Sequence, residues 1–293
     1  MAAGDELKPS WTPLKIIQWA VPFLSQKGIK NPRFDAETLI ASALKIDRLK
    51  VYLQFDRPLD PDELALIREM MRRRSKMEPI QYITGQREFY GLPFKVSPAV
   101  LIPRPETELL VELALEYLKN LPEEKRRVLD LGTGSGCIGL SLAKNIACQV
   151  WAVDISKPAL EIAQENADRL GIEGIQWREG DWFSALRPED PGQFEVILSN
   201  PPYIALTEKE ALDQEVKDFE PFEALFSGET GLKAYEALAE KLEQRLSREG
   251  MALLELQANQ SDNISALFEG GQWNKRVYPD LQGLPRVLEL KAK

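Results

Sequence analysis

The chain has 293 residues, of which 44% are hydrophobic and 28% charged, and its formal net charge is −9. This composition excludes a fibrous or disordered chain, and the length predicts two domains. Because the sequence has no histidine and only two cysteines, it also excludes histidine-based hydrolases, histidine-ligated zinc and a disulfide framework, so catalysis must use carboxylates, amides, backbone groups, tyrosine or a cofactor.

No stretch of the chain resembles a membrane anchor or a leader peptide. No apolar run reaches the roughly 18 to 20 residues that span a bilayer. Residues 1–6 lack a basic segment followed by an apolar one. We therefore expect a cytoplasmic protein with no membrane partner and no metal.

The net charge is unevenly spread along the chain. Residues 1–80 hold 14 Lys and Arg against 11 Asp and Glu, a net charge of +3, which leaves −12 for the remainder. Nucleic-acid phosphates bind to basic stripes, so a nucleic-acid surface on the C-terminal part is disfavoured. The run Arg72, Arg73 and Arg74 has two equal interpretations, a solvated helix end or a partner-binding patch.

Residues 11–75 predict a small bundle of helices, because their apolar residues recur with helical spacing. Thr12 followed by Pro13 is a good helix start. A second helix is expected from Pro32 or Arg33 to about Leu44. A third begins at Asp60, where an Asp-Pro-Asp-Glu capping box stands. We assign residues 1–76 to an N-terminal helical domain.

The residue composition changes after this bundle. Short alternating runs around Gly85 and Gly91 predict a β-hairpin linker at 77–105. Strands and helices then alternate through 106–293, which is typical of a doubly wound, parallel α/β sheet covered by helices on both faces. The expected strands are 128–130, 149–153, 175–178, 194–198 and 252–256, and the expected helices are 135–144, 158–170 and 232–246.

A glycine-rich loop follows the first expected strand of this sheet and opens a helix. Its residues are Gly132, Thr133, Gly134, Ser135 and Gly136. Glycine permits the unusual dihedral angles of such a turn and lets a ligand approach bare backbone. The loop predicts a ligand-binding turn, and the alternative is a tight strand-to-helix corner with no ligand.

The next strand ends at Asp154, which stands 22 residues after Gly132. An acid at this distance can accept hydrogen bonds from both hydroxyls of a ribose, so the pattern favours a nucleoside ligand. Nicotinamide dinucleotides and S-adenosylmethionine both carry adenosine. The second is favoured because Asp130 before the loop would attract a cationic amino-acid group and repel a pyrophosphate.

Asp181 and Trp182 follow the third strand of the sheet. The carboxylate of Asp181 can hold an adenine amino group, and the face of Trp182 can stack on the ring. The alternative for Trp182 is a partly buried core aromatic residue.

The fourth strand runs into the tetrapeptide Asn200, Pro201, Pro202 and Tyr203, at an edge of the sheet where ligands bind. The Asn200 side-chain oxygen and the Pro201 backbone carbonyl can each accept one N–H of an amide or amino group, which frees and aims its nitrogen lone pair. Tyr203 can pack against the flat acceptor group. The alternative is a proline-stiffened turn plugged by a tyrosine.

These motifs resemble the class I S-adenosylmethionine-dependent methyltransferases, and more closely the bacterial protein-(glutamine-N5) methyltransferases that modify peptide chain release factors. The resemblance extends from about residue 30 to the C-terminus. Besides the glycine loop and the tetrapeptide, the segments that carry it are 79–85, 88–92, 101–108 and 284–287. The sequence departs from the family pattern at 254–260, where a glycine is expected soon after the glutamate.

The resemblance implies a helical domain that docks the substrate protein, a hairpin linker and a seven-stranded methyltransferase domain at 106–293. It implies S-adenosyl-L-methionine as the cofactor, bound by Gly132 to Gly136, Asp154 and Trp182, with Asn200 touching it as well. It also implies that Asn200 to Tyr203 bind the glutamine of the Gly-Gly-Gln motif in release factors. We expect a monomer that binds no nucleic acid directly.

Two other functions compete with this one. A nucleobase amino-methyltransferase can use the same tetrapeptide, but the net charge of −12 on residues 81–293 opposes a polyanionic substrate. A nucleotide-binding dehydrogenase, or a silent binding module, leaves the tetrapeptide without a role. Residues 204–228, which are rich in acids, form either a solvated loop, which we favour slightly, or a mobile lid that orders around the partner.

Overall fold

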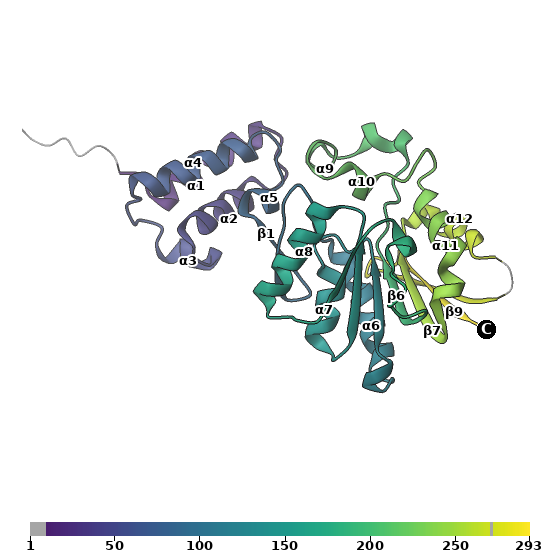
Figure 1. Cartoon of the computed structure of the whole chain (residues 1–293). Helices are drawn as coiled ribbons and strands as arrows, with labels where there is room; N and C mark the ends of the chain where they lie inside the picture. Colours follow the sequence, from purple (N-terminus) through teal and green to yellow (C-terminus); the bar gives the residue numbers. More distant parts are fainter. Residues whose placement is uncertain (1–9, 270–271) are drawn as a thin grey trace, which may run out of the picture. The chain divides into compact units, whose positions relative to one another are not determined.

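The computed structural model describes residues 10–269 and 272–293 (Figure 1). The chain divides into two compact units at Gly85. The segment Asp213–Phe219 groups with the N-terminal unit, although its neighbours in sequence belong to the C-terminal one. Each unit has its own buried core.

The N-terminal unit is helical. Its helices are α1 (Pro13–Gln26), α2 (Pro32–Leu44), α3 (Arg48–Leu53), α4 (Pro61–Arg74) and α5 (Ile80–Thr84), with α9 (Gln214–Phe219) from the later segment. The three predicted helix starts are confirmed: the Thr12 side chain caps α1, Pro32 opens α2, and Asp60 and Glu63 form the capping box of α4. The short helices α3 and α5 were not predicted.

The arginine run at the end of α4 does not behave as a single patch. Arg72 is exposed and pairs with Glu69, whereas Arg73 pairs with Glu78. Arg74 is only 4% exposed. Both interpretations of the run from sequence are therefore wrong for Arg74, which is a buried structural ion.

Arg74 joins three parts of the helical unit. Its Nε donates to Asp35 of α2 at 2.6 Å, one terminal nitrogen donates to Glu215 of α9 at 2.7 Å, and the other donates to the Glu78 carbonyl at 2.9 Å. Asp35 is also buried, at 4% exposure. Lys30 adds an exposed ion pair to Asp213. These contacts explain why 213–219 groups with the helices.

The predicted hairpin is present but shorter than expected. It consists of β1 (Gln86–Phe89) and β2 (Leu92–Lys95), paired antiparallel. Tyr90 and Gly91 form its two-residue turn, and both have positive φ, as the turns that suit a hairpin require. Gly85, which was expected within the hairpin, instead caps α5 in a left-handed conformation.

The C-terminal unit contains a seven-stranded sheet with the order β5-β4-β3-β6-β7-β9-β8. The strands are β3 (Arg127–Leu131), β4 (Gln149–Asp154), β5 (Gln176–Glu179), β6 (Phe194–Ser199), β7 (Leu246–Glu255), β8 (Trp273–Pro279) and β9 (Pro285–Ala292). The first five are parallel, as predicted. The strands β9 and β8 were not predicted individually, and they are antiparallel.

Helices cover both faces of this sheet (Figure 1). On one face lie α6 (Glu108–Leu118), α7 (Cys137–Asn145) and α8 (Lys157–Leu170), and on the other lie α11 (Lys233–Arg245) and α12 (Ser261–Leu267). Successive strand residues alternate between the two cores: Val128 packs with the first set of helices and Leu129 with the second. The predicted fold class is confirmed.

The strand order reverses between β3 and β6. The chain moves outward from β3 through β4 to β5, and then returns to place β6 on the other side of β3. Ligands of open α/β sheets bind at the carboxyl ends of the strands beside such a reversal. The glycine loop after β3 and the tetrapeptide after β6 both begin at this point.

Candidate active site

The glycine loop and the tetrapeptide start side by side. Leu131 and Ser199, the last residues of β3 and β6, are paired in the sheet. The Ser199 hydroxyl also donates to the Leu131 carbonyl at 2.8 Å. Because β4 lies on the other side of β3, Asp154 ends at the same edge.

Asp130 fixes the shape of the glycine loop. It is fully buried, and its Oδ2 accepts hydrogen bonds from the Thr133 hydroxyl at 2.6 Å and from the Gly139 N–H at 3.1 Å. Burial raises its pKa to about 6. Asp130 does not line the cavity described below. Its Oδ1 has no hydrogen-bond partner among the described residues, so the expectation that Asp130 attracts a cationic group of the ligand stays a prediction.

Asp154 faces the glycine loop and the cavity. Its Oδ2 accepts from the Gly134 N–H at 2.8 Å and its Oδ1 from the Ser156 N–H at 2.9 Å. Burial raises its pKa, and these backbone hydrogen bonds oppose that shift. A carboxylate has about four acceptor positions, and the backbone N–H groups of Ser156, Gly134 and Ile155 do not fill all of them, so a ligand can still bond to Asp154.

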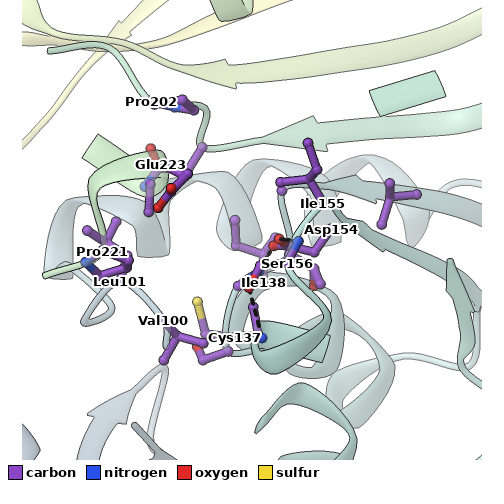
Figure 2. A pocket seen from close by; sticks show the side chains of 18 of the residues that line it. Val100, Leu101, Cys137, Ile138, Asp154, Ile155, Ser156, Pro202, Pro221 and Glu223 are labelled. Carbon is purple, nitrogen blue, oxygen red and sulfur yellow. Dashed lines mark hydrogen bonds between the residues drawn. The ribbon is translucent and has the colours of Figure 1, made fainter. Parts of the chain in front are cut away.

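A cavity of about 480 Å³ opens at this edge of the sheet, within the size range of small-molecule sites. Figure 2 shows Val100, Leu101 and Pro221 on one side of it and Asp154 and Ile155 on the other. The walls therefore come from three places: the strand ends, the segment 99–107 and the connection after the tetrapeptide.

Nine of the twelve predicted site residues line this one cavity. They are Gly132, Thr133, Gly134, Ser135, Asp154, Asp181, Trp182, Asn200 and Pro202. Gly136, Pro201 and Tyr203 do not line it. At Gly136 a Cβ atom would lie 2.8 Å from Leu140, so this glycine is required for packing of α7. Pro201 is buried, and the predicted role of its backbone carbonyl stays a prediction.

Trp182 combines the two interpretations given to it. Its ring packs on the core beside α11, and it also lines the cavity. The ring lies 3.7 Å from the position that a Cβ atom on Gly132 would occupy. A Cβ atom there would be in ordinary contact with the ring, and the φ of +71° is what favours glycine at 132.

Sequence reasoning missed the walls formed by 99–107 and 221–224. The segment 101–108 served only as a family motif, with no role given to Arg104 or Thr107, which line the cavity. The connection 204–228 contains the 3₁₀ helix Leu206–Ala211, α9 and α10 (Phe222–Leu225), so it is not a plain solvated loop. Glu220 within it is buried and accepts from Arg104 at 2.6 Å and from the Ile102 N–H at 3.2 Å.

Asn200 sits where the tetrapeptide meets the wall. Its Nδ2 donates to the Thr107 hydroxyl at 3.1 Å. Behind it lies Glu255, whose pKa burial raises to about 7. Burial likewise raises the pKa of Tyr203 to about 12, so its hydroxyl stays protonated at neutral pH. The Asn200 amide, fixed by Thr107, thus faces a partly apolar cavity.

Known proteins match both units. Residues 15–85 match the family model described as PrmC N-terminal domain, and residues 108–217 match Methyltransferase small domain. The release factor glutamine methyltransferase of Geobacter sulfurreducens is 41% identical over 95% of this chain and 96% of that protein. The enzyme of the same name from Koribacter versatilis is 44% identical over 92% and 94%.

Among solved structures, the hMettl16 catalytic domain in complex with MAT2A 3′UTR hairpin 6 has a TM-score of 0.52. It covers 76% of this chain and 82% of that chain at 14% identity, which is a likeness of fold alone.

The reversed strand order, the glycine loop, Asp154 and the Asn-Pro-Pro-Tyr tetrapeptide at one cavity define a class I S-adenosylmethionine-dependent methyltransferase. Within that class, the chain belongs to the release factor glutamine methyltransferase family. The predicted enzyme class and cofactor are thereby confirmed, and the dehydrogenase alternative is wrong.

The residues present fit this cofactor. The loop offers bare backbone at Gly132 and Gly134, both with positive φ. Asp154 keeps acceptor positions for ribose hydroxyls, and the exposed Asp181 carboxylate stands across from the loop in the same lining. Among the described residues no cluster of acidic or cysteine side chains can hold a metal ion. In the same part of the chain, no helix is long and apolar enough to cross a bilayer.

Replacing Asp154 by alanine is expected to raise the Kd for S-adenosylmethionine about 10- to 100-fold, because a hydrogen bond to a charged group contributes about 1.5–3 kcal/mol. Asp154→Asn keeps one acceptor oxygen, so its Kd is expected to lie between those of the wild type and Asp154→Ala. Titration calorimetry measures both, with the exposed Asp168→Ala of α8 as the control. An Asp154→Ala protein that binds the cofactor like the wild type contradicts the assignment.

Gly231 supports the tetrapeptide from outside the cavity. It has a φ of +78°, and a Cβ atom there would lie 2.3 Å from the Tyr203 carbonyl oxygen. Gly228 has a similar φ of +76°, but its nearest neighbour would be Lys233 at 3.5 Å. Both positions therefore strain an alanine equally, and only Gly231 touches the tetrapeptide.

We expect Gly231→Ala to lower kcat at least about tenfold, because small displacements of positioning groups are costly. Gly228→Ala is the matched control and is expected to stay near wild type. Steady-state kinetics of the two variants compares them. Equal losses in both would mean that backbone strain alone, and not contact with Tyr203, is responsible.

Proposed function

We propose that the chain transfers the methyl group of S-adenosylmethionine to the side-chain amide nitrogen of the glutamine in the Gly-Gly-Gln motif of peptide chain release factors. The observation that carries this proposal is the position of Asn200. It lines the cofactor cavity while its Nδ2 is held by Thr107, which leaves its oxygen for a substrate N–H.

Two fixed acceptors orient the nitrogen, and the N–H proton that it loses on gaining the methyl group would pass to solvent, since the chain has no histidine to take it. An amide nitrogen is a poor nucleophile because its lone pair is delocalised into the carbonyl group. The Asn200 oxygen and the Pro201 carbonyl each accept one N–H, which turns the lone pair toward the reacting carbon. Pro201 and Pro202 stiffen the backbone so that this carbonyl needs no reorganisation. The absence of histidine from the chain is consistent with such a mechanism.

The cofactor-binding residues act at the other side of the cavity. The glycine loop, Asp154, Asp181 and Trp182 bind and orient the cofactor, which when bound supplies a methyl group activated on its sulfonium sulfur. Val100, Leu101 and Pro221 restrict access of water from the opposite wall. Tyr203 packs from outside the cavity lining and acts on the shape of the tetrapeptide.

We further propose that the helical unit docks the release factor. Its outer surface carries large apolar side chains, among them Leu49 at 77% and Leu53 at 81% exposure. It also belongs to the part of the chain with a net charge of +3. The enzyme acts as a monomer in the cytoplasm, with neither nucleic acid nor membrane as a partner.

The rival substrate is the amino group of a nucleobase, which presents the same lone-pair problem. The net charge of −12 on residues 81–293 opposes it. Parallel assays with purified release factor and with purified RNA and DNA separate the two. We expect methyl transfer to the protein only, and methylation of nucleic acid alone would reverse the assignment.

A further inference from the structure

The orientation of the Asn200 side chain depends on one buried hydroxyl group. Asn200 Nδ2 donates to Thr107 Oγ1 at 3.1 Å. Thr107 is 2% exposed and ends the 3₁₀ helix Pro105–Thr107, directly before α6. Its hydroxyl therefore meets Asn200 at the wall of the cavity.

The same hydroxyl lies near the carboxyl group of Glu255 and lowers its pKa as a hydrogen-bond donor does. Glu255 is the last residue of β7 and is 1% exposed. Its Oε2 has no hydrogen-bond partner among the described residues. The Tyr235 hydroxyl donates to the Glu255 backbone carbonyl at 2.7 Å, which fixes the end of the strand. Asn200, Thr107 and Glu255 thus form one cluster between the end of β7 and the tetrapeptide.

The direction of these hydrogen bonds matters because the oxygen and the N–H₂ group of an asparagine amide have nearly the same shape. One accepts a hydrogen bond, whereas the other donates. A hydroxyl has one proton to donate and two lone pairs to accept with. When ionised Glu255 takes the Thr107 proton, Thr107 can only accept from Asn200. The Asn200 N–H₂ end is then held against Thr107, and its oxygen faces the other way.

We propose that Thr107 and Glu255 are positioning residues, which set the direction of the Asn200 amide so that its oxygen, and not its nitrogen, meets the substrate N–H. The inference rests on the proposed function, since it concerns the group that accepts the glutamine amide. Neither residue touches the reacting atoms. They disfavour the flipped orientation of the Asn200 amide. In that orientation its N–H₂ group would face the N–H of the substrate, and no hydrogen bond could form.

Protonation of Glu255 reverses the donor and acceptor roles between Glu255 and Thr107. A protonated carboxyl group donates to Thr107, and the Thr107 proton is then free to point at Asn200. Burial raises the pKa of Glu255 to about 7, against the lowering by the Thr107 hydrogen bond and by Arg286. The charged and titratable groups that face it are Arg104, Glu106, Cys137, Tyr203, Tyr235 and Arg286.

We expect kcat to rise with pH through about 7, as Glu255 loses its proton. Without histidine, few other groups of the chain titrate there, and the pKa of Asp130 is lower, at about 6. Glu255→Gln keeps the shape but removes the charge and the titratable proton, and its amide can turn either its oxygen or its N–H₂ group toward Thr107. This variant is expected to lose about tenfold in kcat and to lose the rise near pH 7, while any step from Asp130 remains.

The direct test removes and restores the hydroxyl. Thr107→Val keeps the shape without the oxygen and is expected to lower kcat about tenfold, with a smaller change in the Kd for the cofactor. Thr107→Ser retains the hydroxyl and should recover most of the loss. Thr38→Val is the matched control, since the Thr38 hydroxyl is buried without a hydrogen-bond partner among the described residues, and it should leave kcat unchanged.

The outcomes are distinct. Unchanged kcat in Thr107→Val, or an equal loss in Thr107→Val and Thr107→Ser, would overturn the inference while wild-type activity upholds the function. A Glu255→Gln enzyme with the wild-type pH profile would also overturn it. A wild-type enzyme that methylates no release-factor glutamine defeats the proposed function, and this inference with it.

Discussion

Asn200→Ala is expected to lower kcat for methylation of release factor by about 10² to 10³, the loss typical when one preorganised hydrogen-bonding group is removed from a transition state. The Asn200 oxygen acts mainly when the amide nitrogen is reshaped for attack, so its loss weakens the transition state more than the bound state. The Kd for the cofactor is expected to change much less, because Asp154 and the glycine loop remain.

Single-turnover kinetics with saturating cofactor measures this effect separately from binding. The control is Asn145→Ala, an exposed asparagine at the end of α7 that lies outside the cavity. Equal turnover in Asn200→Ala and wild type would remove Asn200 from the mechanism. A loss confined to cofactor affinity would make it a binding residue only.

Arg74→Ala is expected to destabilise the helical unit by about 3–5 kcal/mol, the usual result of removing one partner of a buried ion pair. Asp35, at 4% exposure, would be left with a buried and unpaired charge. Glu215 would lose the bond that holds α9 to α4. The exposed Arg72→Ala, whose partner Glu69 is half exposed, is expected to cost no more than about 1 kcal/mol.

Urea unfolding followed by circular dichroism compares these two variants. A loss below about 1 kcal/mol in Arg74→Ala would show that water or other side chains compensate Asp35. Limited proteolysis adds a local readout, since release of α9 should expose 213–219 to cleavage in Arg74→Ala and not in Arg72→Ala.

The local signals in the sequence predicted most of the fold and the cofactor side of the site. Helix starts at Thr12 and Asp60 depend on neighbouring residues only, and they were found. The glycine loop and the tetrapeptide were found because each follows a buried strand, and parallel strands bring their ends to one edge. The alternation of β3, β4, β5 and β6 with helices is therefore sufficient to predict that the nine site residues lie together.

The remaining features depend on contacts between distant segments. The wall at 221–224 is set by Glu220, whose partner Arg104 lies 116 residues earlier in the chain. The arginine run at 72–74 predicts an exposed side chain for Arg74. Its burial depends on ion pairs with Asp35 and Glu215, which are distant in the sequence. The strand β8 is largely exposed, so its sequence lacks the apolar pattern that would have revealed the antiparallel end of the sheet.

The central claim is that this chain holds a release-factor glutamine by its amide and methylates the nitrogen. The most direct measurement is fragment mass spectrometry of purified release factor after incubation with the wild-type chain and S-adenosylmethionine, beside a reaction with Asn200→Ala. The account predicts one added methyl group on the side-chain nitrogen of the Gly-Gly-Gln glutamine, strongly reduced with the variant. A methyl group on any other residue, or none on the release factor, would contradict it.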